Sequence, residues 1–307
     1  MRRLLMLIAV LGAAAPLVLL AVQDDEGSPA ASAAAHEHHA AQVGLPPQRA
    51  VVLARESREL AVALAIEPGM PLRLTATIIN GQGVGVDGLD VELIAGTAAS
   101  GASNRGQTCG RGCYTASLPV RAPTRFAVNI AGAGPVRSVA FPQPGRWAPT
   151  SGTAFLARAT RAFRSLRTVL YTERLSSGPG HTIFTTWKLE APNSVEYAIL
   201  GGADGIVIGR TRWDRLRAGA PWEESTSTLL PQPIPSWSVR IANAYVLHRT
   251  PSRVTISWLD RDRRAWFTGT FDRATARPIE VRMTGPAHFM RQRYRAFNHG
   301  VRIVPPT

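Results

Sequence analysis

The sequence predicts a mainly β protein in which a curved antiparallel sheet wraps around a single amphipathic helix and follows a smaller β domain. Two observations carry this prediction. Residues 150–307 contain one helical segment and then roughly ten short alternating segments, with no second helix to cover them. Residues 49–144 contain about seven short strand-like segments separated by turns. A sheet with apolar side chains on both faces needs a cover or a ligand.

The helix is predicted between Thr153 and Leu170. Apolar residues recur there at roughly 100° per residue, and arginines occupy the opposite side. The apolar stripe comprises Phe155, Leu156, Ala159, Ala162, Phe163, Leu166, Val169 and Leu170. The pattern changes to period 2 at Tyr171, so strands are expected from there onward.

Apolar and polar residues alternate clearly in 182–189 and 254–258, as they do in half-buried strands. Further strands are predicted at 195–199, 205–209, 238–247, 265–271, 279–283 and 288–297, with a hairpin turn at 260–263. Successive hairpins imply an antiparallel meander.

The order of motifs in residues 150–307 resembles the outer-membrane lipoprotein carrier (LolA) and mycobacterial LppX-like superfamily. The motifs are the helix, the segment from Leu170 to Leu175, Ala191-Pro192-Asn193, the segment from Gly205 to Gly209, Trp213, Pro221-Trp222, Phe289-Met290, Tyr294, Phe297-Asn298 and Ile303. The resemblance implies an unclosed antiparallel half-barrel with a helical lid, and a cavity that carries acyl chains or other lipids.

Six aromatic residues are candidates for the lining of that cavity: Phe155, Phe163, Trp187, Trp258, Trp266 and Phe289. The alternative is that the same aromatics fill a packed interior.

Residues 49–144 are predicted to form an immunoglobulin-like β-sandwich. Strands are expected at 51–55, 60–66, 72–79, 89–94, 114–120, 125–131 and 136–141. The segment from Asn80 to Val91 and the Cys-Gly-Arg-Gly-Cys-Tyr element at 109–114 resemble the YtkA-like (FixH-like) domain of bacterial copper-resistance membrane proteins. That resemblance implies an extracytoplasmic position and a copper-transport membrane protein as a candidate partner.

The two cysteines of the chain, Cys109 and Cys113, are separated by a short segment with two glycines. Such a segment allows the tight loop that a disulfide requires. We predict that the two are bonded; the competing interpretation is a thiolate copper site.

The amino-terminal segment predicts the cellular location of the protein. Arg2 and Arg3 precede an uncharged apolar run from Leu4 to Val22, close to the ~20 residues that span a bilayer. Residues 1–23 are therefore a signal peptide or, as we favour, an uncleaved single-pass anchor in the cell membrane with the bulk of the chain extracytoplasmic. Cleavage would instead give a secreted protein.

Residues 24–48 form a predicted flexible linker that contains His36, His38 and His39. Three imidazoles this close together suit Cu(II) or Zn(II). The alternative is a solvated tail segment without a metal role.

The net charge of the chain and the absence of catalytic motifs limit the classes of function that are expected. The formal charge is +14, and it comes almost wholly from scattered arginines, which argues against nucleic-acid binding and for attraction to anionic membrane surfaces. No nucleophile elbow, zinc-protease motif or phosphate loop occurs, so an enzyme is not expected. The sequence predicts a membrane-tethered binding protein for lipid or another apolar ligand, with copper handling through the histidine cluster as the alternative.

Overall fold

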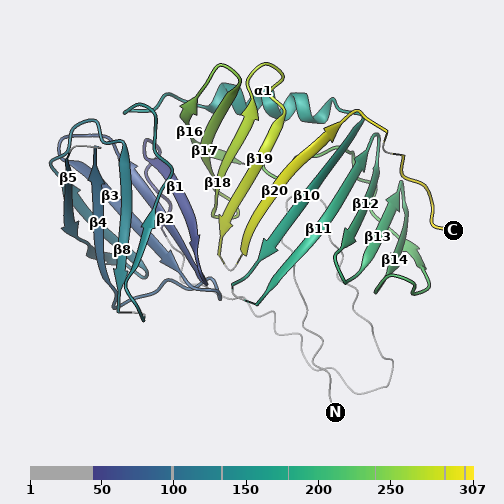
Figure 1. Cartoon of the computed structure of the whole chain (residues 1–307), viewed down its shortest axis with the longest axis horizontal. Coiled ribbons are helices and arrows are strands. Elements are labelled where there is room, and N and C mark those ends of the chain that lie inside the picture. Colours follow the sequence, from purple (N-terminus) through teal and green to yellow (C-terminus); the bar gives the residue numbers. More distant parts are fainter. Residues whose placement is uncertain are drawn as a thin grey trace, which may run out of the picture.

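A computed structural model describes residues 44–307 except 98–99, 133, 179, 239, 287 and 301. The described chain is mainly β, with two small antiparallel sheets, one large antiparallel sheet and a single helix (Figure 1). The predicted anchor at 1–23 and most of the predicted linker lie outside the described residues. Within the described ranges, no helix combines the length and the apolar character that crossing a bilayer requires.

Residues 51–140 form two sheets, which we call the N-terminal sheet pair. Their strands are β1 (Val51–Ser57), β2 (Leu60–Glu67), β3 (Leu72–Ile79), β4 (Asp90–Gly96), β5 (Gly101–Arg105), β6 (Gln107–Gly110), β7 (Cys113–Leu118), β8 (Arg125–Ala131) and β9 (Arg137–Ala140). One sheet has the order β1-β2-β3-β7-β6 and the other the order β5-β4-β8-β9. The two sheets share one apolar core, to which alternate residues of both contribute, such as Leu64, Leu74, Leu93 and Val128.

The seven strands predicted in this region are present with shifts of one or two residues at several ends. The sequence missed β5 and β6. Most residues of these two strands are exposed, so they lack the apolar alternation that identifies the other strands.

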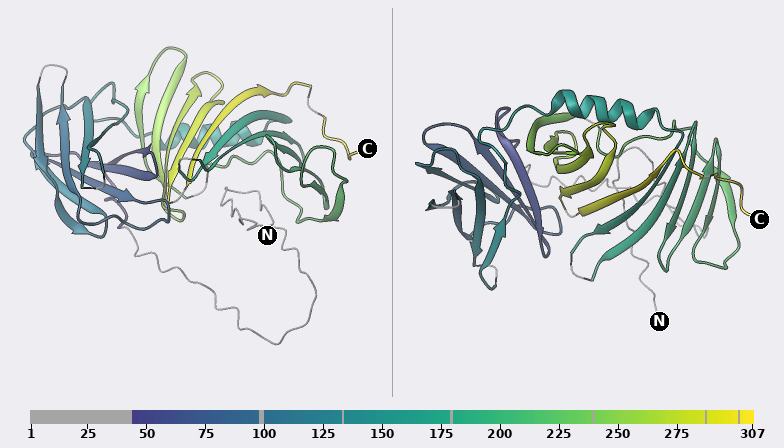
Figure 2. Two further views of the ribbon diagram at one scale, coloured as in Figure 1. Left: turned by 60° about the horizontal axis from the view of Figure 1, so that its bottom comes forward. Right: turned by 45° about the horizontal axis from the view of Figure 1, so that its top comes forward.

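The second half of the chain forms the large sheet. Its strands are β10 (Thr168–Ser176), β11 (Thr182–Glu190), β12 (Ser194–Ile199), β13 (Asp204–Ile208), β14 (Thr211–Arg215), β15 (Glu223–Thr226), β16 (Ile241–Arg249), β17 (Arg253–Asp260), β18 (Ala265–Asp272), β19 (Pro278–Gly285) and β20 (His288–Phe297). The sheet consists of two meanders joined by the pairing of β10 with β20. In the described chain β15 and β16 are the two edges and do not pair, so the sheet is curved but not closed (Figure 2).

The helix α1 (Thr153–Arg164) is shorter than predicted. The prediction that it continues to Leu170 was wrong, because Val169 and Leu170 already belong to β10. The amides of Arg167 and Thr168, at the start of β10, donate to Oδ1 of Asn298 directly after β20, at 2.7 and 3.4 Å. This contact with a distant part of the chain stabilises the start of the strand, where the local pattern still favours a helix.

We call the face of the large sheet that packs against α1 the inner face and the opposite one the outer face. Leu156, Ala159 and Phe163 of α1 are buried in the cluster that fills the inner face. In Figure 2 the helix lies across one end of the strands.

The N-terminal sheet pair packs against the outer face. Val52, Ala61 and Ala63 form one apolar cluster with Trp266 and Phe289 of the large sheet. Polar contacts extend this contact region: Nδ2 of Asn243 donates to the carbonyls of Pro47 and Ala50, both at 2.8 Å, and Arg174 pairs with Glu56 at 3.1 Å. The part of the outer face that includes Trp266 and Phe289 is therefore covered by protein.

Candidate ligand site on the inner face

Four of the six predicted lining residues come together on the inner face. Phe155 and Phe163 project from α1, Trp187 from β11 and Trp258 from β17, and all four belong to or pack on the same cluster. Phe163 and Trp258 are almost fully buried, with 1% and 0% of their surface exposed. The inner face is thus rich in aromatic side chains, as the sequence pattern indicates.

Trp266 and Phe289 lie elsewhere. Trp258 pairs with Phe267 across β17 and β18, so Trp266 points to the opposite side of the sheet. Both residues pack against the N-terminal sheet pair on the outer face. They therefore lie outside any cavity between α1 and the inner face.

A segment that the sequence analysis missed lies on the inner face. The chain between β15 and β16 crosses from one edge of the large sheet to the other, and Trp237 in it is 1% exposed. The Trp237 ring lies 6.1 Å from that of Phe163 and 5.3 Å from that of Phe271, and its carbonyl accepts a hydrogen bond from Nε1 of Trp258. A lone tryptophan after three closely spaced prolines was the only sequence signal. We call residues 227–238 the crossing segment.

The crossing segment has irregular structure and is held at separate points. The amide of Gln232 donates to the carbonyl of Pro192 at 2.7 Å, and that of Ser227 to the carbonyl of Arg210 at 2.8 Å. Nε1 of Trp237 is buried and makes no well-aligned hydrogen bond in the described chain, although it interacts with the Tyr294 hydroxyl closely enough to oppose the rise in the pKa of that tyrosine. A poorly aligned partner recovers only part of the free energy that burial of an N–H costs.

A buried polar network lies among the aromatics. Glu173 of β10 accepts hydrogen bonds from Nε2 of Gln292 at 2.7 Å and from Nε1 of Trp187 at 3.3 Å. Oε1 of Gln292 in turn accepts from the hydroxyls of Tyr294 and Ser236, at 2.7 and 2.8 Å. Burial raises the pKa of Glu173 above its usual value, and the two donated hydrogen bonds oppose that shift only in part.

A second polar cluster lies further along the same face. The Arg212 guanidinium binds both carboxylate oxygens of Asp214, and the Tyr197 hydroxyl donates to Asp214 at 3.0 Å. Burial, together with the negative charge of Asp214, raises the pKa of Tyr197 to about 12. The buried charge of Arg212 is therefore neutralised by a neighbour on the same strand.

A small cavity adjoins this cluster. Its lining includes Trp187, Tyr197, Val207, Arg212 and Leu230, and its volume is about 40 Å³. That volume holds a few water molecules, whereas pockets for lipid-sized or drug-sized ligands run to roughly 300–1,000 Å³. A larger ligand enters here only if the crossing segment moves outward.

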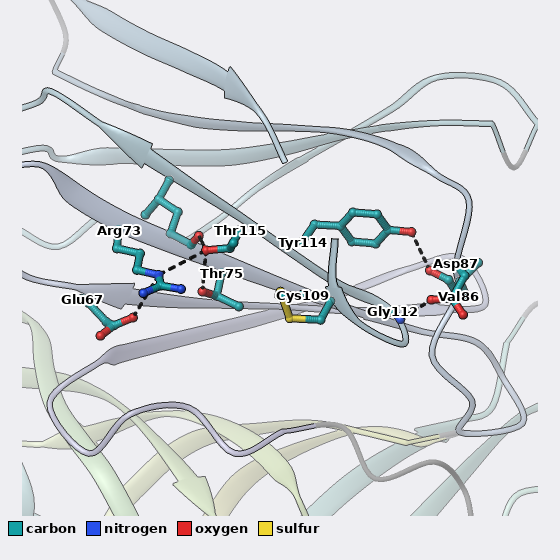
Figure 3. Close-up of a disulfide and its surroundings, with 11 residues drawn as sticks. Glu67, Arg73, Thr75, Val86, Asp87, Cys109, Gly112, Tyr114 and Thr115 are labelled. Carbon is teal, nitrogen blue, oxygen red and sulfur yellow. Dashed lines mark hydrogen bonds and ion pairs between the residues drawn. A yellow bond between two sulfur atoms is a disulfide. The ribbon is translucent and has the colours of Figure 1, made fainter. Parts of the chain in front are cut away.

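The predicted disulfide between Cys109 and Cys113 is present, with 5.0 Å between the two Cα atoms. Because the sulfurs bond each other, they do not form the alternative thiolate copper site. The intervening loop is held by the amide of Gly112, which donates to Asp87 at 2.7 Å, and by the Tyr114 hydroxyl, which donates to the carbonyl of Val86 at 2.8 Å (Figure 3).

The histidine cluster His36, His38 and His39 lies outside the described residues, so copper binding there remains a prediction. Within the part of the chain that the structure describes, no three His, Cys, Asp or Glu side chains gather as a metal site.

Comparisons with known proteins add little. No family model matches the sequence, and no curated protein matches it. Among solved structures the chain is similar to a LolA superfamily protein from Nitrosomonas europaea, with 10% identity, a TM-score of 0.23, and coverage of 51% of this chain and 96% of that chain. Values this low leave ligand and function to be argued from the residues of this chain.

Proposed function

We propose that the chain is a membrane-tethered, extracytoplasmic and non-enzymatic binding protein that takes a lipid or another apolar ligand on the inner face of the large sheet. In this proposal the large sheet is a LolA-like half-barrel, α1 and the crossing segment form its lid, and the N-terminal sheet pair is an immunoglobulin-like sandwich.

The observation that carries the proposal is the difference between the covers of the two faces. The N-terminal sheet pair covers part of the outer face, with an apolar cluster and an ion pair across the contact. The inner face, which has more aromatic residues, is covered by one helix of 12 residues and by an irregular segment. Such segments open locally at a lower free-energy cost than paired strands do.

The cover of the inner face is expected to open at the crossing segment. The crossing segment inserts one bulky side chain, Trp237, between α1 and the sheet, and its indole N–H makes no well-aligned hydrogen bond in the described chain. An apolar ligand that replaced this side chain would keep the apolar contacts with Phe163, Phe271 and Trp258, while Nε1 of Trp258 would lose the carbonyl of Trp237 as its acceptor. The exchange costs least here because the cover is least regular.

Hydrogen–deuterium exchange of residues 44–307 with and without oleate tests this proposal, once circular dichroism has shown that the shortened chain is folded. Oleate is expected to increase exchange at the amides of Ser227 and Gln232, because their hydrogen bonds break when the crossing segment moves. The amides of β2 and β3 serve as the internal control. Unchanged exchange in 227–238, together with no binding of a fluorescent fatty acid, would refute the proposal.

A further inference from the structure

The outer face carries a groove that the proposed function does not use. It lies between the end of β1 and the strands β17 to β20, and its volume is about 770 Å³. This is far larger than the 40 Å³ cavity of the inner face and within the range of ligand pockets. Trp266 and Phe289 contribute to its lining.

The walls of this groove are strongly basic. Its described lining includes Arg55, Arg58, Arg174, Arg282 and Arg291, against two glutamates, Glu56 and Glu280. The excess of three positive charges is concentrated in one concave place, where the low-dielectric walls strengthen the field. Arg55 and Arg58 are exposed, and no ion pair within the described chain involves either of them.

One carboxylate at the groove is shared by three arginines. Glu280 accepts hydrogen bonds from Arg282 at 2.6 Å, from Arg291 at 2.7 Å and from Arg293 at 3.1 Å. Burial alone would raise the pKa of Glu280, but the hydrogen bonds from Arg291 and Arg282 and their charge outweigh it and lower the pKa to about 2. A single negative charge cannot neutralise three guanidinium groups, so the cluster keeps an excess positive charge that would favour a second anion.

Hydroxyl groups complete the site. Thr255, Thr268 and Thr270 contribute to the lining from the outer face of β17 and β18, and the hydroxyls of Thr255 and Thr270 lie 3.2 Å apart. Guanidinium forks and hydroxyls are the side chains that bind phosphate oxygens, and arginine binds them in a bidentate way.

A second groove, of about 610 Å³, adjoins the first and shares Arg174 and Arg291 with it. It adds Arg293 and Arg295, together with two exposed apolar side chains, Phe184 and Leu200. Basic and apolar groups therefore lie side by side along the outer face.

We propose that the groove between β1 and the outer face of the large sheet is a binding site for a phosphate group, held by Arg55, Arg174 and Arg291. The phosphate belongs either to a free phosphate compound or to an anionic lipid headgroup, whose chain would follow the second groove past Phe184. This site is on the opposite face of the sheet from the proposed apolar site. A failed test of one site therefore leaves the proposal for the other unaffected.

Calorimetric titration of the full chain in neutral maltoside micelles tests the proposal with three probes: inorganic phosphate, short-chain phosphatidylglycerol and short-chain phosphatidylcholine. Binding of phosphate and phosphatidylglycerol alike identifies the phosphate group alone as the ligand. Binding of phosphatidylglycerol alone identifies an anionic lipid. Either result supports the site, provided that the substitutions described next act as expected.

The double variant Arg55→Gln/Arg291→Gln is expected to weaken binding of the active probe at least tenfold. The control Arg161→Gln/Arg164→Gln removes the same charge from the exposed side of α1 and is expected to change affinity less than twofold. Arg55→Gln alone, which disturbs no ion pair in the described chain, is expected to give an intermediate loss. Equal losses in both double variants, or no binding of either anionic probe, would overturn the proposal.

Discussion

The indole N–H of Trp187 donates a hydrogen bond to the carboxylate of Glu173, with 3.3 Å between Nε1 and Oε1, on the buried inner face of the large sheet. This contact places an ionisable group among aromatic rings: Trp187 stacks on Tyr171 with 6.0 Å between their ring centres. A buried carboxyl that loses hydration favours its neutral form, which makes the stability of the sheet depend on pH.

We expect Glu173 to stabilise the fold more at acidic than at neutral pH. Its folded pKa is raised above the ordinary value of 4.5, so its contribution is fully present below 4.5 and is lost as the pH rises through the folded pKa. The slope is at most about 1.4 kcal/mol per pH unit for one group. Urea unfolding of the wild type and of Glu173→Gln between pH 4 and 8 measures it. The variant should lack this component, and equal pH profiles would contradict the assignment.

The disulfide is expected to stabilise the N-terminal sheet pair modestly, because it closes a loop with a sequence separation of only four. The chain-entropy relation gives about 2 kcal/mol for so short a loop. Thermal unfolding of Cys109→Ser/Cys113→Ser should therefore show a small decrease in Tm. Reductant should lower the Tm of the wild type to that of the variant and leave the variant unchanged; a further decrease in the variant would point to another cause.

Gly112 is expected to tolerate no side chain. Its φ is +64°, and a Cβ there would lie 2.5 Å from the carbonyl oxygen of Ile78 and 2.6 Å from Cα of Gly85. Gly88 has a similar φ of +73° with open space around it, so it isolates the effect of the backbone angle. Gly88→Ala should cost about 1–2 kcal/mol and Gly112→Ala clearly more, as measured by urea unfolding. Similar losses in both would mean that the contact is not tight.

Much of the fold follows from local patterns in the sequence. The alternation around Trp187 and Trp258 identifies β11 and β17, and the helical stripe with Phe163 identifies α1. The end of the helix does not follow, because β10 begins where the chain pairs with β11 and β20 and where Asn298, more than a hundred residues away, accepts hydrogen bonds from the amides of Arg167 and Thr168.

The candidate ligand site on the inner face was harder to predict from the sequence than the fold. Periodicity shows that Trp266 belongs to the other face than Phe267, but it does not show which face meets α1 and which meets a second sheet. Trp237 was missed because it lies in a segment without periodicity, where only the packed structure reveals burial. The basic groove combines arginines from β1, β10, β19 and β20, which are scattered in the sequence and adjacent only in the fold.

The most direct test of the apolar site compares Trp237→Ala with Trp266→Ala in titrations with a fluorescent fatty acid. Both variants remove the same side chain from a buried position, but from opposite faces of the large sheet. Trp237→Ala empties the place that a ligand would take, so we expect it to bind the fatty acid at least tenfold more tightly than the wild type, while Trp266→Ala loses stability and keeps wild-type affinity. Unaltered or absent binding in Trp237→Ala would contradict an apolar site beneath the crossing segment.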